Sequence, residues 1–181
     1  MPPILIGLAG PARSGKDSVA NIIKDQTMAM NIAFAEPIKK MLSALLDPIT
    51  PNARWEPVDK EQQIPRIGKS YRQLIQTLGT EWGRDLINPD IWLNLAMTKA
   101  DYWLNLNSHV TITDVRFANE ADAIRQRGGY IWHIDRPNIQ IVNPHASEQQ
   151  QLGHLGDIII DNSGTLGDLR SIVNQQLEAL L

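Results

Sequence analysis

The sequence predicts an α/β fold in which a five-stranded parallel sheet is covered by helices on both faces. Short apolar segments rich in β-branched residues alternate along the chain with stretches whose apolar residues recur at helical spacing. A Gly-rich turn at residues 10–16 joins the first apolar segment to the helix that follows. The 181 residues, of which 43% are hydrophobic, are enough for one well-buried core. Strands that alternate with helices imply right-handed crossovers and therefore parallel strands.

The N-terminal part of the chain predicts two strands and two helices. Residues 4–9 form an apolar run typical of a buried strand, and the apolar residues after the Gly-rich turn have the spacing of a helix. Residues 31–35 predict a second, short strand before the break at Pro37. The next helix is amphipathic, with an apolar face formed by Ile38, Met41, Leu42, Leu45 and Leu46.

The middle of the chain predicts a long excursion followed by helices. Residues 47–70 contain four prolines among charged and polar residues, so they cannot form a regular core element. Residues 71–78 have a helical pattern. Asp90 is a candidate cap for a further helix that runs towards Leu106.

The C-terminal part returns to alternating strands and helices. A helix is expected over residues 118–127, where it stops at two glycines. Thr165 and Asp168 stand in capping-box positions at the start of the last helix. Three further strands are predicted at residues 110–115, 130–134 and 157–161.

These elements predict a single domain with two insertions. The core comprises residues 1–35, 110–134 and 157–181. Residues 36–109 form a substrate-binding insertion, and the polar residues 135–156 are expected to form a lid.

Composition excludes several classes of protein. The net charge of -3, from 17 basic and 20 acidic residues, argues against a broad nucleic-acid-binding face but leaves room for a local anion pocket. The absence of cysteine excludes disulfides, thiolate nucleophiles and Cys-ligated zinc. The N-terminus lacks the features of a signal peptide, and no apolar run approaches the roughly 20 residues that cross a bilayer. We therefore expect a cytoplasmic protein that does not bind membranes.

Residues 10–16, GPARSGK, match the phosphate-binding loop pattern of a Gly, four residues, a Gly and a Lys. In such a loop the backbone N–H groups turn inward around a phosphate chain, and the helix N-terminus adds partial positive charge. Lys16 can reach the β- and γ-phosphate oxygens. The pattern alone leaves open an ordinary Gly-rich turn with a solvated lysine. The candidate nucleotide-binding residues of the loop are Gly10, Ala12, Arg13, Ser14, Gly15, Lys16, Asp17 and Ser18.

The residue after Lys16 departs from the common pattern. Asp17 stands where a magnesium-binding Ser or Thr is usual, and Ser18 comes one place later. Nucleoside monophosphate kinases of the adenylate kinase type show a similar displacement and hold magnesium largely through water. By that resemblance Ser18 would contact the nucleotide phosphates, while Asp17 would either cap the helix or approach the water shell of the metal.

A second candidate site is the segment TITDVR at residues 111–116. Asp114 lies at the carboxyl end of a predicted strand, the edge that faces the ligand crevice in an open α/β sheet. A carboxylate there can hold magnesium or its waters, and Arg116 can clamp a phosphate. The alternative is a surface pair of these two residues. Asp114 is not followed by a glutamate, and no Asn-Lys-x-Asp motif occurs, which argues against motor ATPases and GTPase switches.

The insertion is where acceptor recognition is expected. Residues 71–85, YRQLIQTLGTEWGRD, combine arginines, amides and aromatic residues with two glycines that permit close approach. Arg84 can bind a phosphate, while amide and aromatic side chains can bond to a base or stack on it. Trp82 and Trp92 are equally compatible with core packing, and Arg84 with a solvated surface.

Seven sequence blocks in order resemble one known family. The phosphate loop is followed by FAEPIK at 34–39, the 71–85 block, DIW at 90–92, DVRFANE at 114–120, HASE at 145–148 and DNSGTL at 161–166. Together they resemble the deoxynucleoside monophosphate kinases of tailed bacteriophages and prophages, within the P-loop nucleoside monophosphate kinase superfamily. The blocks GTEWGRD and DVRFxNE are the most diagnostic, and the resemblance covers nearly the whole chain.

The resemblance implies a three-layer P-loop fold whose five-stranded sheet has the order 2-3-1-4-5. It also implies a helical substrate-binding insertion between strands two and three, and a lid between strands four and five. Glu36 stands where an aspartate is expected before Pro37. The adenine of ATP would lie beside Asn162, Gly164 and Thr165, and the lid would contain His145, Ser147 and Glu148. The implied substrate-binding residues are Glu36, Lys39, Tyr71, Gln76, Trp82, Arg84, Trp92 and Arg116.

The predicted function is transfer of the γ-phosphoryl group of ATP to the 5′-phosphate of a deoxynucleoside monophosphate, with Mg²⁺. Lys16, Asp114, Arg116 and Arg136 are the predicted catalytic residues; Asp114, through water, and more weakly Asp17 are the predicted metal contacts. The expected partner is a small nucleotide in the cytoplasm, that of the host for a phage protein, with no nucleic acid or membrane involved. Both a monomer and a homodimer stay open. The alternatives are another small-molecule kinase, such as a dephospho-coenzyme A kinase, and a non-catalytic ATP-binding regulatory module.

Overall fold

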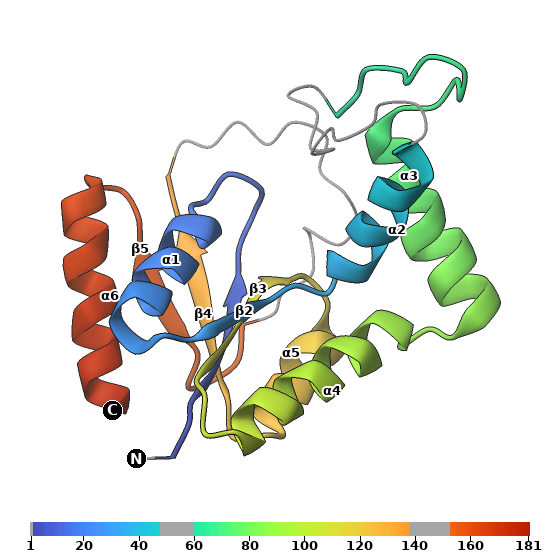
Figure 1. Cartoon of the computed structure of the whole chain (residues 1–181). Helices are drawn as coiled ribbons and strands as arrows, with labels where there is room; N and C mark the ends of the chain where they lie inside the picture. The colour runs from blue at the N-terminus through green and yellow to red at the C-terminus, as the bar shows by residue number, and fades with distance from the viewer. Residues whose placement is uncertain (1, 48–59, 138–152) are drawn as a thin grey trace. The chain divides into compact units, whose positions relative to one another are not determined.

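The structure, a computed structural model, describes residues 2–47, 60–137 and 153–181 (Figure 1). The chain divides into two compact units: Met1–Ala33 with Ala96–Leu181, and Phe34–Leu95. The division falls inside a continuous helix, α4 (Ile91–Asn105). Of the predicted insertions, part of the 47–70 excursion and most of the lid, including His145, Ser147 and Glu148, lie outside the described residues.

The first unit is built on a five-stranded parallel sheet. Its order is β2-β3-β1-β4-β5, which confirms the order that the resemblance implied. Ala9, the last residue of β1, pairs with Val115 on one side and His133 on the other. The loops that follow these three parallel strands therefore all lie at the carboxyl end of the sheet. The strands are β1 (Leu5–Ala9), β2 (Met30–Ile32), β3 (Val110–Val115), β4 (Tyr130–Asp135) and β5 (Ile158–Asp161).

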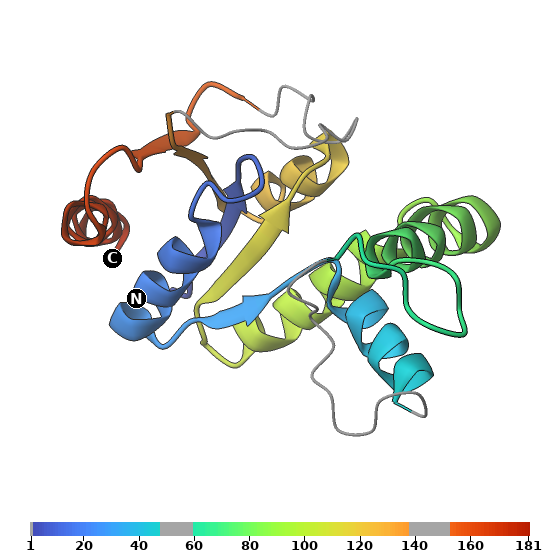
Figure 2. The ribbon, with the colours of Figure 1, turned by 90° about the horizontal axis from the view of Figure 1, so that it is seen from above.

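Helices cover both faces of this sheet, as predicted. α1 (Lys16–Thr27) and α6 (Leu166–Leu180) lie on one face, and α5 (Ala118–Arg125) lies with the C-terminal part of α4 on the other (Figure 2). The apolar faces of α1 and α6 pack on the sheet because their β-branched and leucine side chains recur at helical spacing. The resulting core cluster includes Ile6, Leu8, Ile23, Trp132, Ile134 and Leu177.

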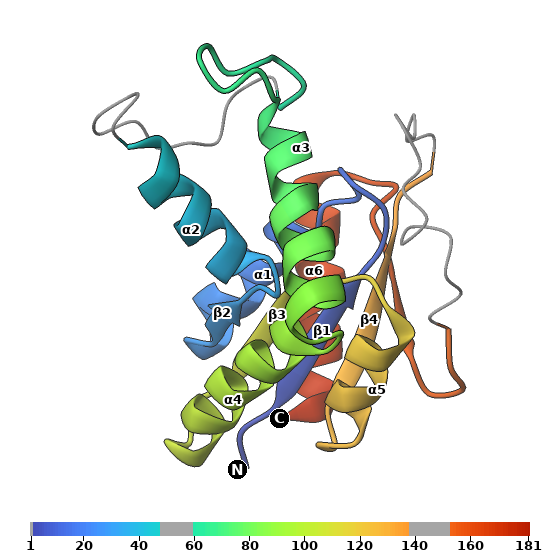
Figure 3. The ribbon, with the colours of Figure 1, turned by 90° about the vertical axis from the view of Figure 1, so that its right-hand side faces the viewer.

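The second unit is helical. It contains α2 (Glu36–Leu46), α3 (Tyr71–Gln76) and a π-helical segment, η1 (Thr77–Ile87), which continues α3 as one column (Figure 3). α3 begins with a capping box in which Ser70 and Gln73 bond to each other's backbone N–H groups. The core of the unit is formed by Leu42, Leu46, Ile64 and Tyr71, with Ile67, Leu74, Ile75 and Leu78 packed against them.

Two element boundaries differ from the sequence predictions by three residues or more. β2 ends at Ile32 rather than at residue 35, because the chain turns at Phe34 and Ala35 to enter α2 at Glu36. The helix predicted for residues 71–78 continues to Ile87 with wider turns, as shown by the bond from the Asn88 N–H to the carbonyl of Gly83, five residues earlier, at 3.0 Å.

Candidate active site

The loop between β1 and α1 has the backbone conformation of an anion-binding turn. Its φ angles are positive at Gly10 (139°), Arg13 (67°) and Gly15 (103°). A Cβ at Gly10 would lie 2.7 Å from the carbonyl oxygen of Ile134, so only glycine fits there. Arg13 adopts a left-handed conformation that costs a side-chain-bearing residue about 1 kcal/mol. The predicted phosphate-binding loop thus has a shape that needs both of its glycines.

The start of α1 can receive an anion. Its N-cap is Gly15, which has no side chain to satisfy the N–H groups of the first helical turn. Asp17 is exposed and Ser18 is half-buried in that turn. A phosphate group would satisfy these donors and interact favourably with the helix dipole.

Lys16 places its charge on the loop itself. Its Nζ donates hydrogen bonds of 2.8 Å to the carbonyl oxygens of Gly10 and Pro11. The ammonium therefore curls back over the loop that precedes it. Phosphate oxygens are stronger acceptors than these carbonyls, so a bound phosphate chain can take over such bonds.

Ser14 and Asn162 define the inner side of the loop. Ser14 is fully buried, and its Oγ has no hydrogen-bond partner among the described residues. The Asn162 side chain donates from Nδ2 to the Ser14 carbonyl oxygen at 2.7 Å. The structure therefore brings Asn162, which the resemblance assigned to the adenine, into direct contact with the phosphate-binding loop.

Asp114 and Arg116 lie at the carboxyl end of β3, the same end of the sheet from which the loop after β1 starts. Asp114 is half-buried, and Arg116, just after the strand, is exposed. The turn they share is held by Glu120, whose Oε2 accepts the N–H groups of Arg116 at 2.8 Å and Phe117 at 3.1 Å. Glu120 is only 3% exposed.

Sequence reasoning assigned no role to Glu120, although a signal for one was present. Glu120 is the third residue of α5, the position from which a glutamate side chain reaches back to the N–H groups before a helix. A buried carboxylate that accepts two backbone N–H groups fixes the path of the chain between them. Glu120 therefore positions the backbone at Arg116 and Phe117, just after β3.

The other predicted adenine residues lie at the start of α6. Thr165 caps this helix, and Asp168 accepts bonds from the Thr165 N–H at 2.8 Å and hydroxyl at 2.7 Å. This confirms the predicted capping box. The hydroxyl bond from Thr165, together with the backbone bond, lowers the pKa of the Asp168 carboxyl below its ordinary value. Gly164 packs against Asp168, where a Cβ would lie 2.8 Å from the carboxylate.

Two of the predicted acceptor residues are buried in the second unit. Trp92 is 3% exposed, donates from Nε1 to the Gly79 carbonyl at 2.7 Å, and lies so close to Gly83 that a Cβ there would come within 2.4 Å of its ring. Tyr71 is 1% exposed in the core of the unit. Their positions are those of packing residues, the alternative that the sequence left open for Trp92.

The remaining acceptor candidates are more accessible. Trp82 is 37% exposed, with its ring centroid 6.3 Å from that of Trp92. Glu36 forms an ion pair of 2.7 Å with Lys40, one turn along α2. Lys39 and Gln76 are exposed and Arg84 is half-buried. All of these residues belong to the second unit, whereas the loop, Asp114, Arg116, Arg136 and Asn162 belong to the first.

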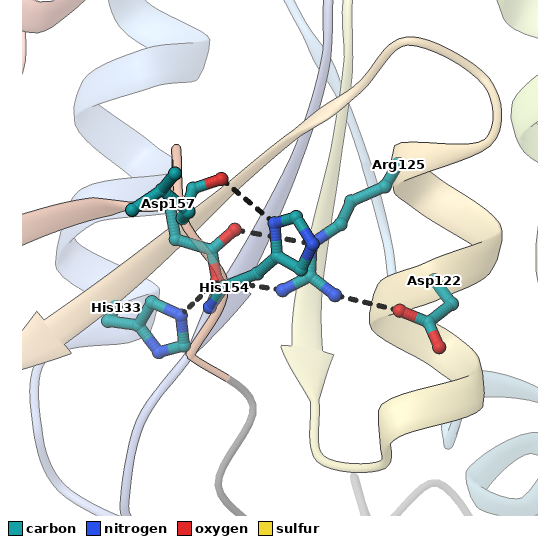
Figure 4. A network of polar contacts seen from close by, with 6 residues as sticks. Asp122, Arg125, His133, His154 and Asp157 are labelled. Atoms are coloured by element: carbon teal, nitrogen blue, oxygen red, sulfur yellow. Dashed lines mark hydrogen bonds and ion pairs between the residues drawn. The ribbon is translucent and has the colours of Figure 1, made fainter.

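A polar network that the sequence did not reveal joins α5, β4 and the segment that leads into β5 (Figure 4). Asp157 accepts bonds from Arg125 Nε at 3.2 Å and Nη2 at 2.7 Å, and from the His154 N–H at 2.9 Å. His133 Nε2 lies 2.8 Å from the same carboxylate and must carry the proton, because a carboxylate only accepts. Burial opposes ionisation of Asp157, but these bonds together lower its pKa below the ordinary value.

Asp114 is suited to contact a magnesium ion that binds together with a nucleotide. No group of three or more potential metal-ligating side chains occurs in the part of the chain that the structure describes. Mg²⁺ usually keeps several waters and binds one or two carboxylates together with substrate phosphates. Asp114 beside a phosphate-binding loop provides such a donor set.

The residues that the structure describes include no helix with both the length and the apolar character of a membrane span.

Comparisons with known proteins agree with the sequence resemblance. The model of the family described as deoxynucleotide monophosphate kinase matches residues 4–65 and 60–173. A protein of Acanthamoeba polyphaga mimivirus with the provisional name deoxynucleotide monophosphate kinase is 30% identical over 190 residues, which cover 93% of each chain. The deoxynucleoside-5′-monophosphate kinase of Escherichia phage T5 is 26% identical over 210 residues, covering 81% of this chain and 80% of its own.

Solved structures support the fold. TT1252 from Thermus thermophilus matches with a TM-score of 0.53 at 14% identity and covers 100% of both chains. The dephospho-CoA kinase of Campylobacter jejuni matches with a TM-score of 0.50 at 13% identity, covering 97% of this chain and 96% of that one. At these identities the likeness concerns the α/β P-loop fold alone.

Proposed function

The chain belongs to the deoxynucleotide monophosphate kinase family, and from this premise we propose the reaction that it catalyses: transfer of the γ-phosphoryl group of ATP to the 5′-phosphate of a deoxynucleoside monophosphate, with ADP and the deoxynucleoside diphosphate as products. One observation in the structure carries the proposal. The loop between β1 and α1 has the positive φ angles of an anion-binding turn and holds the Lys16 ammonium over its carbonyls.

The donor side of the reaction is assigned to the first unit. The loop N–H groups and the start of α1 would bind the phosphates of ATP, and Lys16 would exchange its carbonyl partners for phosphate oxygens. Because charge spreads over the phosphoryl oxygens during transfer, cations held beside them lower the barrier. Arg116, and Arg136 at the start of the proposed lid, would add to this charge.

Asp114 is proposed to hold magnesium, through water, with Asp17 as a weaker contact. When bound with ATP, Mg²⁺ neutralises charge on the phosphates. Asp114 would hold the metal's water shell from the end of β3, next to Val115, which pairs with Ala9 of β1.

The acceptor is assigned to the second unit. Its attacking atom is an anionic phosphate oxygen, so no strong general base is needed and positioning is sufficient. Arg84, Lys39 and Gln76 can bind the phosphate or base edge, and the exposed face of Trp82 can stack on a base. Tyr71, Trp92 and Glu36 would shape this surface, the first two by packing from beneath it.

The test is an acceptor panel with ATP and Mg²⁺. Deoxynucleoside monophosphates, ribonucleoside monophosphates and dephospho-coenzyme A are supplied separately, and ADP and the phosphorylated product are quantified. We expect acceptor-dependent ADP with the deoxynucleoside monophosphates. Product from dephospho-coenzyme A alone would identify the other kinase class. ATP binding without ADP formation from any acceptor would identify a non-catalytic module. Light scattering during size-exclusion chromatography distinguishes a monomer from a homodimer.

A further inference from the structure

We infer that Asn162 is a positioning residue for the phosphate-binding loop and does not recognise the base of the nucleotide. The inference rests on the proposed function, because it takes the loop after β1 to be where the donor phosphates bind. It goes beyond that function by giving Asn162 a different partner from the adenine that the sequence resemblance implied.

The hydrogen bonds of Asn162 connect the carboxyl ends of β4 and β5 with the loop after β1. Asn162 is the first residue after β5, and its backbone N–H donates to the carbonyl oxygen of Asp135, the last residue of β4, at 2.7 Å. Its side-chain Nδ2 donates to the carbonyl oxygen of Ser14, in the loop after β1, also at 2.7 Å. One residue thus fixes the loop to the carboxyl ends of two other strands.

The fit between Asn162 and Gly15 shows that this contact is built into the loop. A Cβ at Gly15 would lie 2.3 Å from Asn162 Nδ2, so the amide occupies the space that any other residue at position 15 would fill. Gly15 also needs its φ of 103° to cap α1. Glycine at position 15 therefore permits the turn and also leaves room for the amide, which a Cβ would displace.

Holding the Ser14 carbonyl also orients the next N–H group. The peptide between Ser14 and Gly15 is planar and trans, so its C=O and N–H point in opposite directions. With the carbonyl oxygen bound to Asn162, the Gly15 N–H must point away from Asn162. A loop N–H whose direction is fixed before the ligand arrives binds phosphate without the entropic cost of ordering the peptide.

The same bonds occupy two of the three N–H donors of Asn162. Its backbone N–H and one of its two side-chain N–H groups are engaged within the protein. Recognition of adenine through these donors would require giving up bonds of good length.

The experiment compares two ligands that share the phosphate chain. Binding of ATP and of inorganic tripolyphosphate is measured by calorimetry for the parent, Asn162→Ala and Asn174→Ala. Asn174 is a matched control, because it is also half-buried but lies on α6, and its Oδ1 has no partner among the described residues. Loss of one hydrogen bond predicts that Asn162→Ala weakens both ligands by the same factor, about fivefold to tenfold, while Asn174→Ala changes neither.

Each other outcome overturns the inference in a distinguishable way. Weaker ATP binding with unchanged tripolyphosphate binding would show that Asn162 acts on the adenosine part. Unchanged binding of both would show that the contact does not matter. If the parent protein bound neither ATP nor tripolyphosphate, the proposed function itself would be contradicted. If Asn162→Ala does not fold, as judged by its thermal unfolding, Asn162→Ser is measured in the same way.

Discussion

Glu120 offers a test of how the end of β3 is held, because its carboxylate accepts two backbone N–H groups from within the core. A hydrogen bond to a charged acceptor contributes about 1.5–3 kcal/mol. Glu120→Ala removes the bonds to Arg116 and Phe117 and leaves both N–H groups without their acceptor. We therefore expect the free energy of unfolding to fall by about 3–4 kcal/mol. Glu120→Gln keeps an acceptor oxygen but loses the charge, and should cost about 1–2 kcal/mol.

The assay is urea unfolding followed by circular dichroism, together with steady-state kinetics at a temperature where every variant is folded. With an m-value of about 2 kcal/mol per molar urea, the midpoint of Glu120→Ala should lie about 1.5–2 M below that of the parent. Misplacement of the Arg116 segment should lower kcat by about tenfold to a hundredfold. The KM for ATP should change little, because the loop after β1 is untouched. Glu178→Ala, an exposed change on α6, is the control and should match the parent.

Two results would refute this reasoning. An unchanged urea midpoint in Glu120→Ala would mean that the two bonds do not stabilise the fold. A lowered midpoint with an unchanged kcat would mean that Glu120 supports the fold without positioning Arg116 for the reaction.

Three further predictions follow from the site and from the network around Asp157. Lys16→Ala should lower kcat by at least about a hundredfold, because it removes a cation from the developing phosphoryl charge. Steady-state kinetics checks this on a variant whose circular dichroism spectrum matches that of the parent. A loss in kcat below about tenfold would contradict it. Arg84→Ala should mainly raise the KM for the acceptor, whereas Arg116→Ala should mainly lower kcat, and kinetics with ATP and acceptor varied separately tests the division. The folded-state pKa of Asp157 is lowered, so its contribution to stability is present above the unfolded pKa of about 3.9 and is lost as the pH falls through the lower folded value. Asp157→Asn keeps an acceptor oxygen but loses the charge, so it should lower the free energy of unfolding at pH 7 by about 1.5–3 kcal/mol. It should also flatten the dependence of stability on pH between about pH 5 and pH 2. Equal acid unfolding profiles for variant and parent would contradict this.

The fold could be predicted from the sequence where periodicity and chain chemistry agree. The apolar run before GPARSGK indicated the central strand β1, and the capping-box positions of Thr165 and Asp168 indicated the start of α6. The end of β2 was predicted too late, since nothing local separates an extended Phe34 from one in a turn. The π-helical turns of η1 were not predictable, because helical spacing does not distinguish five-residue from four-residue hydrogen bonding over a short segment.

The site was predictable to the level of its residues but not of their partners. The motif indicated the loop, yet the contact between Ser14 and Asn162 spans 148 positions and exists only because β1 and β5 lie in one sheet. Trp92 carries no sign in the sequence that Gly83 leaves room for its ring. Long-range complementarity of this kind depends on tertiary packing, which composition and spacing do not encode locally.

The two carbonyl bonds of Lys16 have a consequence for how binding begins. A free lysine side chain samples many rotamers, and ordering it costs up to about 2 kcal/mol. In this protein that loss of freedom is met during folding, since the ammonium already rests on Gly10 and Pro11. An incoming phosphate chain therefore meets an ammonium group that is already ordered. Exchanging its carbonyl partners for phosphate oxygens requires motion of a few atoms rather than of the whole side chain.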